Sequence, residues 1–121
     1  MKLSEAGLPA CGPTARTLGA RVPADIQPDH ENRVHPGSGG MSVILDDPLL
    51  LPRHRRPAQL AEGIGKDPVW EIRGNNMGNT LGIRPDPRNP REHAFVEPIA
   101  PTPLEAYQQS LCDTAPSWRR L

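Results

Sequence analysis

The side chains best suited to bind a polar ligand are Ser42, His93 and Glu97. Ser42 follows Gly39 and Gly40 closely, and a serine hydroxyl beside glycines can hydrogen-bond a ligand that approaches the backbone. His93 can donate or accept a hydrogen bond near neutral pH. Glu97 would share one face of a regular strand with His93, where a carboxylate can act as an acid or a base. Each of the three also has a structural interpretation, as an ordinary turn or strand residue.

Trp70 and Phe95 are two of the few aromatic residues in the chain, which has two tryptophans, one tyrosine and one phenylalanine. Large apolar groups are scarce here, so packing in the core is one use for both rings. Stacking on the ring of a ligand is the other.

The charges give no global attraction to nucleic acid or to a membrane, because 14 basic residues balance 14 acidic ones. The basic run from Arg53 to Arg56 contains no interleaved aromatic residue, which is typical of loop charges rather than of an RNA-binding motif. Contact with a pyrophosphate is its other interpretation. The histidines and cysteines lack metal-ligand spacing. We therefore expect no nucleic acid, no membrane and no metal as partners.

Four short apolar runs, each bounded by proline, glycine or turn residues, predict strands. The first follows Gly40 and ends at Asp46, and the last begins at His93 and ends at Pro98. Alternation in the first run places Ser42 and Ile44 on one face. The predicted strands are residues 41–45, 69–72, 81–84 and 93–96.

The residues after this last strand predict a C-terminal helix. Thr102 can cap it, Pro103 suits the first helical position, and Glu105 lies three residues after Thr102, as a capping box requires. An apolar stripe formed by Leu104, Tyr107 and Leu111 indicates a buried face, and the helix should end near Cys112.

The chain of 121 residues is long enough for one modest core. Its 16 prolines and 11 glycines favour long irregular connections, and those within residues 1–38 leave that segment without any sustained strand or helix period. We expect an irregular or partly disordered N-terminal arm over residues 1–38. Residues 39–121 should form a small α+β domain, a sheet followed by the C-terminal helix.

Cys11 and Cys112 lie near opposite ends of the sequence and form no CxxC pair. A disulfide between them would close a long loop, whereas two inert thiols are expected in a reducing compartment. We expect free thiols because no apolar stretch has the length of a bilayer span or a signal peptide. The chain is therefore expected to be a soluble cytoplasmic protein, or one delivered to a target cell without a cleaved signal.

Three blocks in fixed order resemble a known family. They are Gly39-Gly40-Met41-Ser42-Val43, the run around Trp70, and His93-Ala94-Phe95-Val96-Glu97-Pro98 leading into Pro103-Leu104-Glu105-Ala106-Tyr107. This frame, which covers residues 38–111, is similar to that of a type VI secretion effector toxin family with the ADP-ribosyltransferase fold. Ser42 and His93 match the serine and the histidine of the family pattern.

The resemblance implies an NAD-dependent toxin domain that transfers ADP-ribose to an intracellular target not yet identified, with an immunity protein as a candidate partner. The candidate catalytic residues are Ser42 and His93, which the resemblance implies, and Glu97, which is chosen because it shares a strand face with His93. The implied contacts to NAD come from Gly39, Gly40, Ser42, Trp70 and Phe95.

Two departures from the family pattern keep an alternative open. Met41 stands where the family often has a second hydroxyl, and the arginine of the family's early strand has no evident counterpart, because Arg16, Arg21 and Arg33 all lie in poor strand contexts. The alternative is a catalytically inactive or truncated member that acts as a binding or interaction module.

Overall fold

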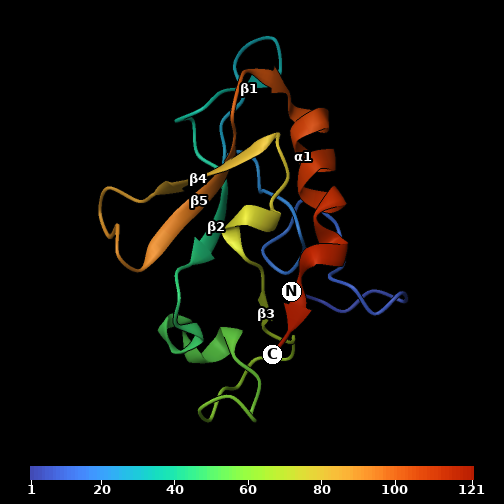
Figure 1. Ribbon diagram of the computed structural model, residues 1–121, viewed down its shortest axis with the longest axis vertical. Coiled ribbons are helices and arrows are strands. Elements are labelled where there is room, and N and C mark those ends of the chain that lie inside the picture. Colours follow the sequence, from blue (N-terminus) through green and yellow to red (C-terminus); the bar gives the residue numbers. More distant parts are fainter.

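A three-stranded antiparallel sheet with one helix beside it forms the centre of the molecule (Figure 1). The computed structural model describes residues 1–121. The sheet has the order β2-β5-β4, with β2 spanning Met41–Ile44, β5 His93–Pro98 and β4 Leu81–Pro85. The helix α1 spans Leu104–Asp113. The chain is thus a small mixed α+β protein, and this part of the predicted fold class is confirmed.

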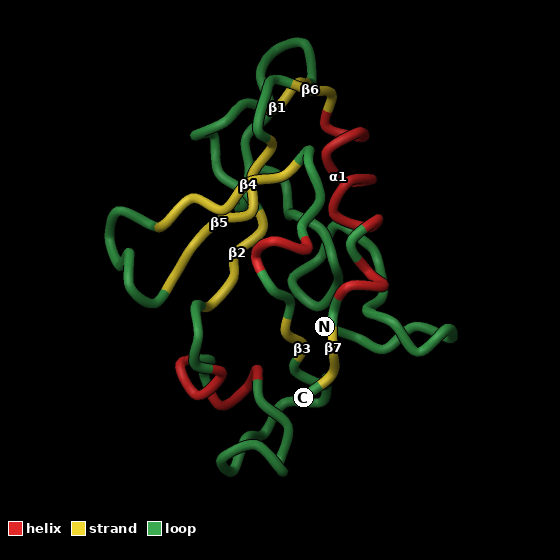
Figure 2. The backbone as a smooth tube through the Cα atoms, in the orientation of Figure 1, coloured by secondary structure: helices red, strands yellow, loops and turns green.

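Two minor strand pairs complete the β structure. β1 (Arg33–Val34) pairs with β6 (Thr102–Pro103), and β3 (Trp70–Glu71) pairs with β7 (Arg119–Arg120). Loops make up most of the backbone (Figure 2), and both chain ends lie beside β3 (Figure 1). The 3₁₀ turns are Pro48–Leu50, Arg53–Arg55, Gly74–Asn76 and Ala115–Ser117. No helix combines the length and the apolar character that a membrane span requires.

All four predicted strands are present, although β3 keeps only two of the four residues expected. In the sheet, Ser42 lies opposite Phe95, and Ile44 lies opposite His93. Opposed residues of an antiparallel pair share a face, so Ser42, His93 and Phe95 lie on one face. The other face of β5 carries Ala94 and Val96, both fully buried.

The C-terminal helix is present, but the predicted capping box is wrong. Thr102 belongs to β6 and pairs with Val34, so the N-cap position passes to Pro103, which has no capping side chain. Pairing with β1 thus decides the conformation of Thr102. The helix buries Tyr107 and Leu111, two residues of the predicted stripe.

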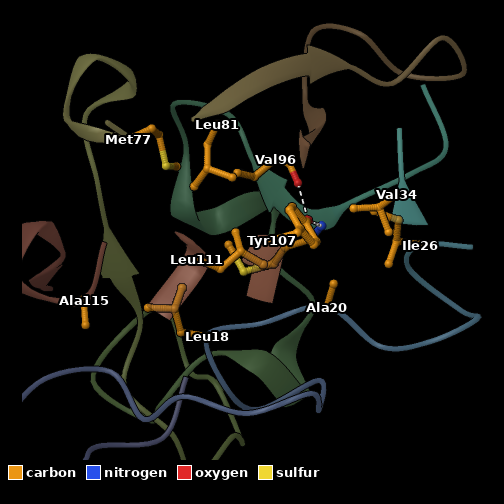
Figure 3. Packing of buried hydrophobic residues seen from close by; sticks show 11 residues of the cluster. Leu18, Ala20, Ile26, Val34, Met77, Leu81, Val96, Tyr107, Leu111 and Ala115 are labelled. Carbon is orange, nitrogen blue, oxygen red and sulfur yellow. Dashed lines mark hydrogen bonds between the residues drawn. The ribbon is translucent and has the colours of Figure 1, made fainter. Parts of the chain in front are cut away.

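One hydrophobic cluster joins the N-terminal arm to the sheet and the helix (Figure 3). Leu18, Ala20, Ile26 and Val34 of the arm are all buried in it, together with Tyr107 of α1. Besides the two-residue strand β1, the arm contains isolated bridges and no longer strand. It nevertheless has a fixed path, because its apolar side chains pack into the same core as residues 39–121.

The expectation of free thiols is wrong, because Cys11 and Cys112 form a disulfide. The arm folds back against the C-terminal end of α1 and brings the two Cα atoms to 5.5 Å, a separation suited to such a bond. The Gln108 side chain also binds the arm, since it accepts a hydrogen bond from the Ala20 N–H and donates one to the Ala20 carbonyl. The bond and these contacts hold residues 11–20 along the helix.

Candidate functional site

A cavity of about 720 Å³ lies beside β2, the edge strand of the sheet. Residues 41–47 line it continuously, and because their side chains alternate between faces, the cavity extends around the free edge of β2. Residues 68–72 also line it. The N-terminal arm, with Thr17, Gly19 and Arg21 among its contributions, covers a further side. The site therefore depends on the arm that the disulfide holds in place.

Ser42 and His93 both line this cavity, although fifty positions separate them in the sequence. They lie on the neighbouring strands β2 and β5. Ser42 is opposite Phe95, and His93 is two residues before Phe95, so Ser42 and His93 are diagonal neighbours on one face of the sheet. Diagonal neighbours on one face have Cα atoms about 7–8 Å apart, within reach of a shared ligand. Ser42 is exposed and His93 is half-buried.

The ring of His93 is held from two sides. Its Nδ1 lies 2.9 Å from Oδ2 of Asp86, and the ring meets Phe95 edge to face with centroids 5.0 Å apart. The pKa of Asp86 is lowered, chiefly because its carboxylate accepts a hydrogen bond from the backbone N–H of Arg88; burial opposes this effect, and the hydrogen bond with His93 lowers the pKa further. The Asp86 side chain is therefore an anion at neutral pH.

Sequence reasoning missed Asp86, because it lies in the proline-rich turn after β4 and outside every predicted strand. The signal that could have found it is the hairpin between β4 and β5, in which the Asp86 N–H donates to the His93 carbonyl. A hairpin places the residue that follows one strand beside the residue that begins the next.

Glu97 lies outside the cavity lining. Both of its oxygens accept from Nε of Arg84, at 3.0 and 2.9 Å, and one also accepts from the Gly37 N–H at 2.7 Å. Its side chain is only 10% exposed. These contacts give Glu97 a structural use, holding β4, β5 and the end of the arm together.

Gly39 and Gly40 also lie outside the cavity lining, and the backbone around them explains both. Gly39 has φ +105°, and a Cβ there would lie 2.2 Å from the Asp25 carbonyl oxygen. A Cβ on Gly40 would lie 2.2 Å from the Val96 carbonyl oxygen. The paired glycines therefore let the arm and β5 approach the beginning of β2.

The two aromatic candidates differ in position. Trp70 lines the cavity while its indole N–H donates to the Met1 carbonyl at 2.8 Å. It is only 9% exposed, so most of its surface serves packing. Phe95 lies across the register from Ser42 but is absent from the cavity lining.

Two arginines and several carboxylates surround the cavity. Arg21, which sequence reasoning placed in a poor strand context, lines it and forms an ion pair with Asp25. Arg55 donates to the Ala15 carbonyl and forms no ion pair. Glu71 is paired with Arg119. Asp46 and Asp47 are exposed carboxylates at the end of β2, and no group of three acidic, histidine or cysteine side chains is arranged to hold a metal ion.

Comparisons with protein-family models, with curated proteins and with solved structures found no match to this chain.

Proposed function

We propose that the chain is an NAD-binding domain of the ADP-ribosyltransferase type and that the cavity beside β2 takes the dinucleotide. The observation that carries this proposal is the presence of Ser42 and His93 in the lining of one cavity. Its volume of about 720 Å³ falls within the range of about 300–1,000 Å³ typical of ligand sites.

The residues around the cavity match the main groups of such a ligand. Ser42 can hydrogen-bond a carboxamide or a ribose hydroxyl. Arg55 carries no ion pair, so its guanidinium can approach a pyrophosphate. Cleavage of a glycosidic bond builds positive charge on the sugar, and the exposed Asp46 at the end of β2 is a carboxylate available to offset that charge.

The alternative is a module that binds a ligand or partner without turnover. The contacts of Glu97 favour it, because this candidate catalytic carboxylate is held by Arg84 and the Gly37 N–H. In that interpretation the cavity keeps its binding groups but lacks the acid or base that Glu97 would supply.

Calorimetric titration with NAD, together with an assay of nicotinamide release, tests the proposal. The variant Ser42→Ala should weaken NAD binding at least fivefold, the loss expected for about 1 kcal/mol of hydrogen bonding. Ser117→Ala is the matched control, because Ser117 is exposed and outside the cavity lining. Unchanged NAD binding in Ser42→Ala would refute the assignment, and binding without nicotinamide release would favour the alternative.

Expression in a host cell separates the two functions further. An active toxin domain should arrest growth by modifying an intracellular target, and coexpression of an immunity protein should relieve the arrest. Growth without arrest, combined with NAD binding by the purified chain, would indicate the inactive module.

A further inference from the structure

Asp86 and His93 form a carboxylate–histidine pair at the boundary of the cavity. His93 lines the cavity while Asp86 does not, so His93 is the member of the pair that a ligand in the cavity can contact. The side chains are 22% and 16% exposed. A second pair of this kind, His35 with Asp29 at 2.7 Å, lies in the arm and away from the cavity.

The pair determines which nitrogen of His93 carries the proton. An ionised carboxylate can only accept hydrogen bonds, and the pKa of Asp86 is lowered. Nδ1 of His93 must therefore be the donor, which leaves Nε2 without a proton in the neutral ring. Nε2 has no hydrogen-bond partner within the chain, whereas Nδ1 is occupied.

We propose that Asp86 is a positioning residue that orients His93, so that Nε2 of His93 serves as the proton acceptor for a hydroxyl group held in the cavity near Ser42. The arrangement matches that of an oriented base, because a carboxylate holds Nδ1 while Nε2, the other ring nitrogen of a residue that lines the cavity, has no partner within the chain.

The role of this base in NAD chemistry rests on the proposed function. Nε2 of His93 takes a proton from water, or from an acceptor hydroxyl, while the oxygen forms a bond to C1′ of the nicotinamide ribose. The C1′–N bond breaks, its electron pair leaves with neutral nicotinamide, and His93 later releases the proton to bulk water. With water as acceptor, NAD⁺ and H₂O yield ADP-ribose, nicotinamide and H⁺.

Few other charges face His93. Ile44, an apolar residue, lies opposite it on β2, and Phe95 lies beside it on β5. The charged neighbours are Arg88, which donates its backbone N–H to Asp86, and Glu92, whose carboxylate accepts from Asn89. On the β2 side Asp46 follows Leu45, whose N–H donates to the Glu92 carbonyl. Asp86 is the only carboxylate in hydrogen-bond contact with the ring.

The variant Asp86→Asn tests the pair with little loss of structure. Oδ1 of Asp86 accepts from the Arg88 N–H and Oδ2 from His93. In the variant the amide oxygen can keep the Arg88 contact, and the amide NH₂ then faces Nδ1. Nδ1 must become an acceptor, which selects the wrong tautomer. Asp86→Glu restores a carboxylate and serves as the conservative variant.

Nitrogen-15 NMR of the whole chain, recorded above the titration range of histidine, measures the tautomer without any ligand. We expect the Nδ1–H form for His93 in the wild type, the Nε2–H form in Asp86→Asn, and recovery in Asp86→Glu. Acylation by diethyl pyrocarbonate, followed residue by residue by mass spectrometry, should slow at least fivefold at His93 in Asp86→Asn. Asp29→Asn is the matched control, and it should alter His35 but not His93.

Nicotinamide release gives the third measurement. Asp86→Asn should lower kcat by roughly 10²-fold, the lower end of general-base contributions, with KM for NAD within about twofold. A wild-type His93 in the Nε2–H form, or equal acylation rates in the wild type and Asp86→Asn, would overturn the proposal. The expected NMR and acylation results without nicotinamide release would still support the orientation of His93 and would count against the proposed function alone.

Discussion

The hydroxyl of Tyr107 replaces a ladder hydrogen bond at the beginning of β2. It donates to the Val96 carbonyl at 2.6 Å (Figure 3) and accepts from the Met41 N–H at 3.0 Å, and both contacts are buried. Met41 and Val96 are partners in the β2-β5 register. Burial, the largest effect, raises the pKa of Tyr107, so the phenol stays a donor through the range in which exposed tyrosines ionise.

The variant Tyr107→Phe keeps the ring and removes only this bridge. Two buried backbone groups then lose their partner, and each unsatisfied group costs about 1–3 kcal/mol. Allowing for partial closure of the strands, we expect a loss of about 2–4 kcal/mol in the free energy of unfolding. That is a large share of the 5–15 kcal/mol or so typical of a native domain.

Urea denaturation measures this loss, and hydrogen exchange at the Met41 amide locates it. Ser110→Ala is the control, because it removes an exposed hydrogen bond between Thr80 and Ser110 and should change stability by less than about 0.5 kcal/mol. An equally small change in Tyr107→Phe, with unchanged exchange at Met41, would refute the reasoning. It would show that the Met41 N–H bonds directly to the Val96 carbonyl once the hydroxyl is gone.

Three further predictions concern the arm and the loops. Replacing Cys11 and Cys112 by serine removes the disulfide, which joins residues 101 positions apart, and should lower the free energy of unfolding by about 3–5 kcal/mol. The wild type in dithiothreitol should show a similar loss. The stability of the double variant should not change with the reductant. Arg56 is buried and donates hydrogen bonds to three backbone carbonyls. The variant Arg56→Ala should lower the free energy of unfolding by about 2–4 kcal/mol and should speed proteolysis of residues 51–65. Unchanged proteolysis would contradict this role. The pKa of Asp29 is lowered from 3.8 to about 2, and the hydrogen bond with His35 is the largest cause. The stability that ionised Asp29 contributes to the fold is therefore present above pH 3.8 and is lost as the pH falls through about 2. An NMR titration of the carboxyl should show its pKa rising toward 3.8 in His35→Ala.

Local patterns in the sequence were sufficient to predict the main strands and the helix. The apolar runs bounded by glycine and proline correspond to β2, β4 and β5, and the spacing of Tyr107 and Leu111 marks the buried face of α1. Such features depend on residues a few positions apart, where propensity and side-chain period act directly.

The candidate site was predictable only in part. Ser42, His93 and Trp70 line the cavity, but the glycine pair, Phe95 and Glu97 do not. Glycine beside a serine looks the same in sequence whether it admits a ligand or, as at Gly40, a neighbouring carbonyl. A carboxylate such as Glu97 likewise gives no local sign that Arg84 neutralises it.

Long-range pairing decided the rest. The register of β2 with β5 brings Ser42 near His93, the hairpin after β4 brings Asp86 to the imidazole, and the path of the arm joins Cys11 to Cys112. Each of these contacts depends on which segments pack together, and that choice minimises the free energy of the whole chain. The chemical groups are thus evident from the sequence, whereas their proximity exists only in the folded protein.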